Sequence, residues 1–149
     1  MSEIAFYHLE RASIAQALPR LLEKVLSAGH RALVQVGSPT AAAALDSALW
    51  TYDPASFLPH GMAGQGHEAA QPIYITAGEE APNGATVAVI VDGRLPSDLN
   101  KMERYLYMFE GADAMALKKA RAQWRTLKEA GHALTYWQQT ENGGWEKKA

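Results

Sequence analysis

The chain has 149 residues, a net charge of −2 and no cysteine. Apolar residues make up 48% and charged residues 20%, which is typical of a folded protein and excludes a disordered chain. The missing cysteines exclude a disulfide framework, a thiol nucleophile and a cysteine-ligated zinc site. No apolar run of membrane-spanning length and no basic leader is present. We therefore expect a single domain over 1–149, with a polar tail at 140–149, in the cytoplasm.

Apolar periodicity predicts strands and helices that alternate along the chain. In the first predicted helix, we expect the regular part to begin close to Pro19 and to end at Gly29. The two strands on either side of the turn 79–84 are close enough in sequence to pair as a hairpin. In chain order, the predictions are a strand at 4–9, a helix at 13–28, a strand at 32–36, a helix at 40–50, strands at 72–76 and 86–91, helices at 98–109 and 113–130, and a strand at 133–138.

This alternation predicts an α/β fold with one mostly parallel sheet and helices on both faces. The hairpin would make the sheet mixed.

An aromatic turn, residues 49–60, follows the second predicted helix. Its sequence is L-W-T-Y-D-P-A-S-F-L-P-H, with three aromatic residues within eight positions. Two interpretations remain open. The rings fill one edge of the core, or they form an exposed apolar patch that binds a partner protein.

The segment 53–71 has no clear period, and we interpret it as an ordered turn followed by a mobile loop. Within it, 64–69 matches G-x-G-x-x-A, but no strand precedes the match, as a dinucleotide site would require. No phosphate-binding G-x-x-x-x-G-K-[ST] motif occurs. His60 and His67 share the loop without the spacing of a metal site. No serine lies in a G-x-S-x-G motif, so we expect no catalytic residue, no metal and no cofactor.

The helix predicted at 113–130 carries a basic stripe, formed by Lys118, Arg121, Arg125 and Lys128 at helical spacing. Residues 112–128 hold five cations and one acid, a local charge of +4, so the rest of the chain carries −6. Trp124 belongs to the apolar stripe of the same helix, lies between the two stripes and is placed to wall a pocket for an apolar side chain beside the cations. The basic stripe is either a solvated helix face or a docking site for an acidic peptide or a phosphate backbone.

These segments resemble the chi subunit family of bacterial DNA polymerase III. The specific part of the resemblance is W-T-Y-D-P-A-S-F-L-P-H at 50–60. Two residues depart from the usual pattern, because many relatives have Tyr at Trp124 and Lys at Arg125. Leu117 stands where some relatives have Lys. Weaker similarity covers 6–9, 29–34, 44–46, 71–73, 123–125 and 131–134.

The resemblance implies a fold similar to mononucleotide-binding α/β domains and a non-catalytic replication subunit with two binding surfaces. The first would bind the psi subunit of the clamp-loader complex through Trp50, Tyr52, Phe57 and Leu58. Some relatives join a helicase through the same surface. The second would bind the acidic C-terminal tail of the single-stranded-DNA-binding protein and would contact DNA only indirectly. Its implied residues are Lys118, Arg121, Trp124, Arg125 and Lys128.

Two other function classes remain as alternatives. One is direct binding of single-stranded nucleic acid by the basic stripe, although the net charge of −2 weighs against it. The other is a small α/β enzyme that uses a nucleotide, although no phosphate-binding loop is visible.

Overall fold

The structure is a computed structural model, and it describes residues 3–10, 13–51, 60–62, 72–78, 83–96, 99–142 and 144–149. The strands are β1 (Glu3–Leu9), β2 (Ala32–Gln35), β3 (His60–Met62), β4 (Ile73–Thr76), β5 (Val87–Ile90), β6 (Arg104–Glu110), β7 (Ala133–Gln139) and β8 (Trp145–Lys147). The helices are α1 (Ile14–Ser27), α2 (Pro39–Thr51) and α3 (Ala114–Glu129).

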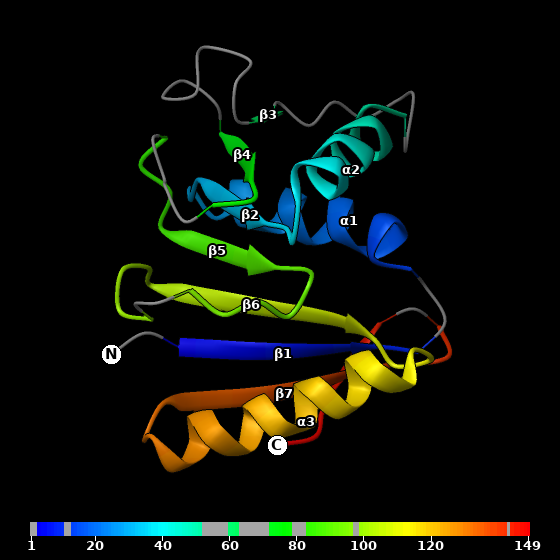
Figure 1. Ribbon diagram of the computed structural model, residues 1–149, viewed down its shortest axis with the longest axis vertical. Helices are drawn as coiled ribbons and strands as arrows, with labels where there is room; N and C mark the ends of the chain where they lie inside the picture. The colour runs from blue at the N-terminus through cyan, green and yellow to red at the C-terminus, as the bar shows by residue number, and fades with distance from the viewer. Residues whose placement is uncertain are drawn as a thin grey trace.

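The described strands form one sheet in the order β3-β4-β2-β5-β6-β1-β7-β8 (Figure 1). Neighbouring strands are parallel from β3 to β7, and β8 is antiparallel to β7. Helices α1 and α2 pack on one face, and α3 packs on the other. The predicted α/β fold, with a mostly parallel sheet and helices on both faces, is confirmed.

The two faces of the sheet bury different side chains. On the face of α1 and α2 the buried core is aliphatic and includes Leu18, Leu22 and Val34. On the face of α3 the core includes Phe6, Tyr107 and other aromatic residues. Because side chains alternate along a strand, β1 contributes to both cores.

The helix predicted at 13–28 is confirmed as α1, but its regular part begins at Ile14 and not close to Pro19, which lies inside the helix. A capping box explains the early start. Ser13 Oγ accepts a hydrogen bond from the Gln16 N–H at 3.2 Å, and Gln16 Oε1 accepts one from the Ser13 N–H at 2.9 Å. Gly29 ends the helix at φ +86°, as predicted.

The helix predicted at 98–109 is wrong, because residues 104–110 form the strand β6. This strand lies between β5 and β1 and is buried on both faces. Tyr107 and Phe109 face α3, whereas Leu106 and Met108 face α1. A strand buried on both faces shows no alternation of apolar and polar residues. The spacing of the apolar residues in 98–109 therefore fits a helix as well as a buried strand.

The predicted hairpin is also wrong. Strands β4 and β5 are separated by β2, which pairs with both of them in parallel. The sheet is mixed because of β8, which belongs to the segment predicted as a polar tail. Trp145 in β8 packs against Tyr7, with ring centroids 5.0 Å apart.

Candidate functional site

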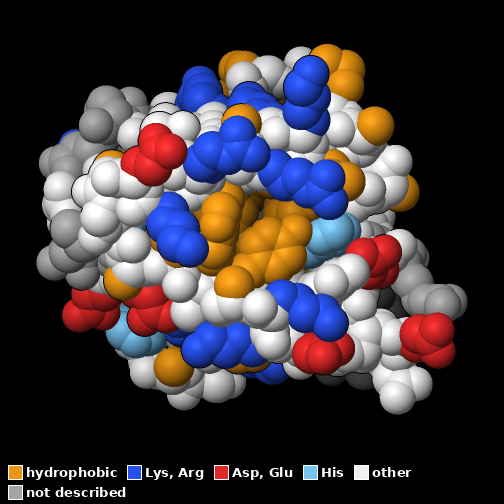
Figure 2. Space-filling model, turned by 90° about the horizontal axis from the view of Figure 1, so that it is seen from below, with side chains coloured by type: hydrophobic (Ala, Val, Ile, Leu, Met, Phe, Trp, Pro, Cys, Tyr) orange, Lys and Arg blue, Asp and Glu red, His pale blue; other side chains and the backbone are white. Residues whose placement is uncertain are grey.

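A pocket of about 1010 Å³ lies between α3 and β7. Seen from the side of α3, it is an apolar hollow surrounded by Lys and Arg side chains (Figure 2). Its lining comes from three parts of the chain: β1, α3, and the C-terminal segment that contains β7 and β8. The lining residues are His8, Arg121, Trp124, Arg125, Lys128, Glu129, Tyr136, Gln138, Lys148 and Ala149.

Helix α3 supplies three of the four Lys and Arg side chains that line the pocket, and its ends are fixed locally. Asp113 caps its first turn by accepting hydrogen bonds from the N–H groups of Met115 and Ala116, at 3.0 and 3.2 Å. Gly131 ends the helix at φ +89°. Between them, the buried Ala120 and Leu127 anchor one side of the helix on the sheet. The opposite side therefore faces solvent.

Aromatic rings form the apolar wall. The Trp124 and Tyr136 rings meet edge to face, with centroids 5.5 Å apart. Beneath them, Phe6 lies 5.3 Å from the Trp124 ring and 6.4 Å from the Tyr136 ring. The buried Phe6 ring contacts Trp124 and Tyr136 from the core side, so it fixes the positions of both rings and leaves the pocket open.

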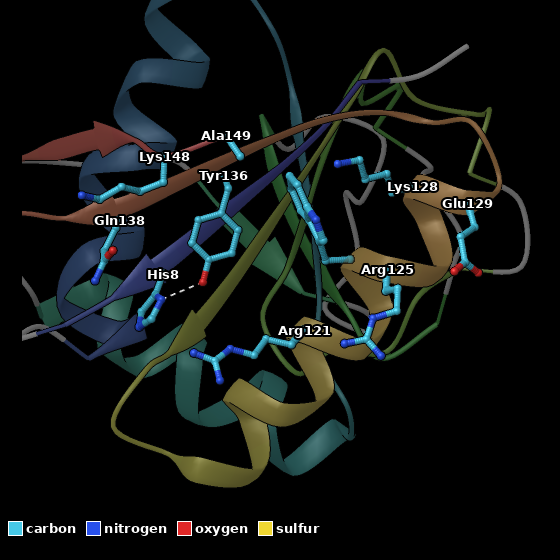
Figure 3. A pocket seen from close by; sticks show the side chains of 10 residues that line it. His8, Arg121, Arg125, Lys128, Glu129, Tyr136, Gln138, Lys148 and Ala149 are labelled. Atoms are coloured by element: carbon cyan, nitrogen blue, oxygen red, sulfur yellow. Dashed lines mark hydrogen bonds between the residues drawn. The ribbon is translucent and has the colours of Figure 1, made fainter.

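A hydrogen-bonded histidine borders this wall. His8 Nδ1 lies 2.7 Å from the Tyr136 hydroxyl (Figure 3). On the other side of the ring, His8 Nε2 lies 3.1 Å from Glu10 Oε1. A neutral imidazole satisfies both partners when Nε2 carries the proton, because Nε2–H then donates to Glu10 and the tyrosine hydroxyl donates to Nδ1.

Burial lowers the pKa of His8; Glu10 opposes this shift and Arg121 adds to it. Burial also raises the pKa of Tyr136, so its hydroxyl keeps its proton at neutral pH. The polar edge of the apolar wall is therefore uncharged.

Positive charge dominates the rim of the pocket. Arg121, Arg125, Lys128 and Lys148 line it together with one acid, Glu129. Within the described part of the chain, none of the three α3 cations forms an ion pair with an acidic side chain. Unpaired cations around an apolar hollow can bind a ligand that carries both carboxylates and an apolar group.

Four of the five residues predicted on the long helix meet at this pocket: Arg121, Trp124, Arg125 and Lys128. Lys118 is exposed on α3 and does not line the pocket. The four predicted residues of the aromatic turn lie outside what the structure describes. Trp50 is in the last turn of α2, but its side chain is not described, and Tyr52, Phe57 and Leu58 fall in the range 52–59.

Sequence reasoning missed the pocket residues that come from other elements. Tyr136 and Gln138 were visible only as alternate positions of a predicted strand, and Lys148 only as a residue of a polar tail. Alternation along β7 indicates that 134, 136 and 138 share a face, but no local signal places that face against α3.

The carboxyl ends of the parallel strands are where a nucleotide would bind if the chain were a nucleotide-using enzyme. There, the Asp92 carboxylate after β5 accepts a hydrogen bond from the Gly37 N–H, just before α2. In mononucleotide-binding folds, a phosphate binds in the crevice at these strand ends. A carboxylate at this position argues against a nucleotide phosphate, because two anions would repel each other.

The described residues contain no group of three or more His, Asp or Glu side chains placed to hold a metal ion. Among them there is also no helix with the length and apolar content needed to cross a bilayer. The expectation that no strand precedes the G-x-G-x-x-A match is wrong, because β3 (His60–Met62) lies directly before it. The match itself and His67 lie in 63–70, outside the described residues.

Two comparisons with known proteins agree. A family model described as "DNA polymerase III chi subunit, HolC" matches residues 1–135. The "Probable DNA polymerase III subunit chi" of Rickettsia prowazekii (strain Madrid E) is 31% identical over 113 residues, which cover 74% of this chain and 67% of that protein. The chain therefore belongs to the DNA polymerase III chi subunit family, an accessory subunit family of DNA replication.

Proposed function

We propose that this chain is a non-catalytic adaptor of the polymerase complex, and that its pocket binds the acidic C-terminal tail of the single-stranded-DNA-binding protein. A second surface, the aromatic turn, binds the psi subunit of the clamp-loader complex. The chain would then link the polymerase to single-stranded DNA that is already coated with protein. The observation that carries the first part is the apolar pocket bordered by the three α3 cations, which form no ion pair with an acidic side chain of the described residues.

The positive charge at the rim of the pocket favours an acidic ligand. The α3 cations repel one another, and a ligand with several carboxylates relieves that repulsion. Arg121 and Arg125 can each bind a carboxylate through two parallel hydrogen bonds, whereas Lys128 offers a point charge. Exposed charges are screened over about 8 Å at physiological ionic strength, so we expect affinity to fall as salt is added.

The apolar wall favours a peptide ligand that carries an apolar side chain in addition to its acidic residues. Trp124 and Tyr136 present ring surface that a nonpolar side chain can cover, which adds affinity that salt does not weaken. An acidic peptide that ends in an apolar residue fits both properties of the pocket.

The test is a titration of the purified chain with a fluorescently labelled peptide that is rich in Asp and ends in an aromatic residue. We expect Arg125→Ala to weaken binding by roughly 1–3 kcal/mol, because it removes a charge-assisted contact. Lys24→Ala is a suitable control, since it removes an exposed positive charge from α1 on the other face of the sheet. Equal affinity of the two variants would remove Arg125 from the site.

The psi contact has its own test. Trp50→Ala is expected to abolish copurification with psi and to leave peptide binding unchanged. A helicase assayed in the same way would show whether the aromatic turn has a second partner. Retention of psi by the folded variant would place its binding site elsewhere.

A gel-shift assay with a single-stranded oligonucleotide and the chain alone distinguishes direct DNA binding from the adaptor function. A cationic pocket attracts phosphates as well as carboxylates. The adaptor proposal expects no shift at physiological salt in the absence of the single-stranded-DNA-binding protein. A stable shift that Arg125→Ala removes would favour nucleic acid as the ligand.

A further inference from the structure

We propose that the C-terminal β-hairpin, β7 with β8 and the two residues after it, forms the second wall of the peptide site, and that Lys148 contacts the acidic ligand directly. This inference rests on the proposed function. It goes beyond the family match, because residues 1–135 match the family model whereas Tyr136, Gln138 and Lys148 lie after it.

Backbone pairing fixes the position of Lys148. Its N–H donates to the carbonyl oxygen of Tyr136 at 2.7 Å, and the Tyr136 N–H donates to the backbone oxygen of Ala149 at 3.3 Å. Residue 148 is therefore held beside the tyrosine whose ring lines the pocket. The close view shows Lys148 next to Gln138 and Tyr136, with Arg121 and Arg125 projecting from α3 (Figure 3).

Side-chain alternation decides which lysine of the hairpin faces the pocket. In the β7–β8 register, Trp145 pairs with Gln139 and Lys147 pairs with Trp137. Trp145 and Trp137 both pack against the aliphatic core on the α1 face. Successive side chains of a strand point to opposite faces, so Lys147 shares the α1 face whereas Lys148 lines the pocket on the α3 face.

Lys148 is available to an anionic ligand. Its Nζ lies 3.3 Å from Glu146 Oε1, and both side chains are exposed. An exposed ion pair of this kind contributes about 0–1 kcal/mol, so exchanging Glu146 for a carboxylate of the ligand costs little. With Lys148 added, cations border the pocket from two elements, and an extended acidic peptide between them would meet positive charge on both sides.

The first experiment compares two neighbouring lysines. Lys148→Ala and Lys147→Ala remove the same charge from adjacent positions of the C-terminal segment, but only the first side chain lines the pocket. With the labelled acidic peptide used above, we expect Lys148→Ala to weaken binding about 2–5-fold, in the range of an exposed ion pair, and Lys147→Ala to leave it nearly unchanged. Circular dichroism verifies that both variants fold.

The second experiment measures contact rather than affinity and uses the absence of cysteine from the chain. Lys148→Cys and Lys147→Cys each introduce a single thiol. When a mild oxidant is added to accept the two electrons released by the two thiols, a peptide that carries one cysteine within its acidic segment should form a disulfide with the first variant and not with the second.

The outcomes separate this inference from the proposed function. Weaker binding by Arg125→Ala, together with equal affinities and equal cross-linking for the two hairpin positions, would overturn the role of Lys148 and leave the pocket intact. A wild-type chain that binds no acidic peptide would overturn both. A loss confined to Lys148→Ala, with cross-linking confined to Lys148→Cys, is the expected result.

Discussion

The two faces of the sheet are covered differently. Two helices, α1 and α2, cover an aliphatic face, whereas one helix, α3, covers the face where the buried aromatic side chains of the described residues gather. Small branched side chains interdigitate closely beneath a pair of helices. A single helix leaves part of the aromatic face beside it uncovered, and Trp124 and Tyr136 line the pocket there. The candidate binding pocket therefore lies at an edge of the aromatic core that α3 leaves uncovered.

The largest expected effect is a loss of stability from a substitution in the aliphatic core alone. Leu22 lies on the side of α1 that faces the sheet and is fully buried, so Leu22→Ala should lower the free energy of unfolding by about 2–5 kcal/mol. Peptide affinity should stay at the wild-type value, measured at a temperature where the variant remains folded. Denaturant unfolding and the peptide titration test the two statements separately. A parallel loss of affinity would mean that the two faces are coupled.

A comparable substitution on the aromatic face should affect both properties. Phe6 contacts the rings of Tyr107, Trp124 and Tyr136. Aromatic pairs contribute about 0.5–1.5 kcal/mol each beyond burial, so Phe6→Leu should cost on the order of 3 kcal/mol of stability. It should also weaken peptide binding, because the pocket wall loses its support. Stability lost with unchanged affinity would contradict a shared role for these rings.

Gly111→Ala tests how tightly His8 is enclosed. A Cβ at residue 111 would lie 2.0 Å from His8 Nε2, so the imidazole must move, which disturbs its contacts with Glu10 and Tyr136. Overpacking of this kind costs about 1–3 kcal/mol. Gly144→Ala is a matched control, since the closest atom to its Cβ is 3.4 Å away. Equal melting temperatures of the two variants would show that His8 is loosely held.

The smallest expected effect is a pH dependence of stability. Burial lowers the pKa of His8 in the folded chain below the ordinary 6.5, so the unfolded chain binds a proton more readily than the folded chain below that pH. The free energy of unfolding should therefore fall as the pH drops from 7 to below 6.5 and through the lowered pKa of folded His8. His8→Gln should reduce the fall measured in thermal melts. A steeper fall in the variant would contradict a neutral, buried His8.

Local patterns in the sequence determined much of the fold. The helix at 113–130 and the glycine stop at Gly29 lie where the sequence predicted them. Both depend on short-range signals, to which the structure adds the Asp113 cap at the start of α3. The basic stripe was likewise readable, because helical spacing places Arg121, Arg125 and Lys128 on one face whatever the helix packs against.

Tertiary structure alone decided the rest. Residues 104–110 have an apolar spacing that fits a helix, and only their burial between β5 and β1 makes them a strand. The order of β4, β2 and β5 depends on long-range pairing that no local pattern encodes. The pocket depends on it too, because His8, Trp124, Tyr136 and Lys148 become neighbours only when β1, α3 and the C-terminal hairpin pack together. A sequence specifies which side chains share one element, whereas packing between elements decides which of them meet.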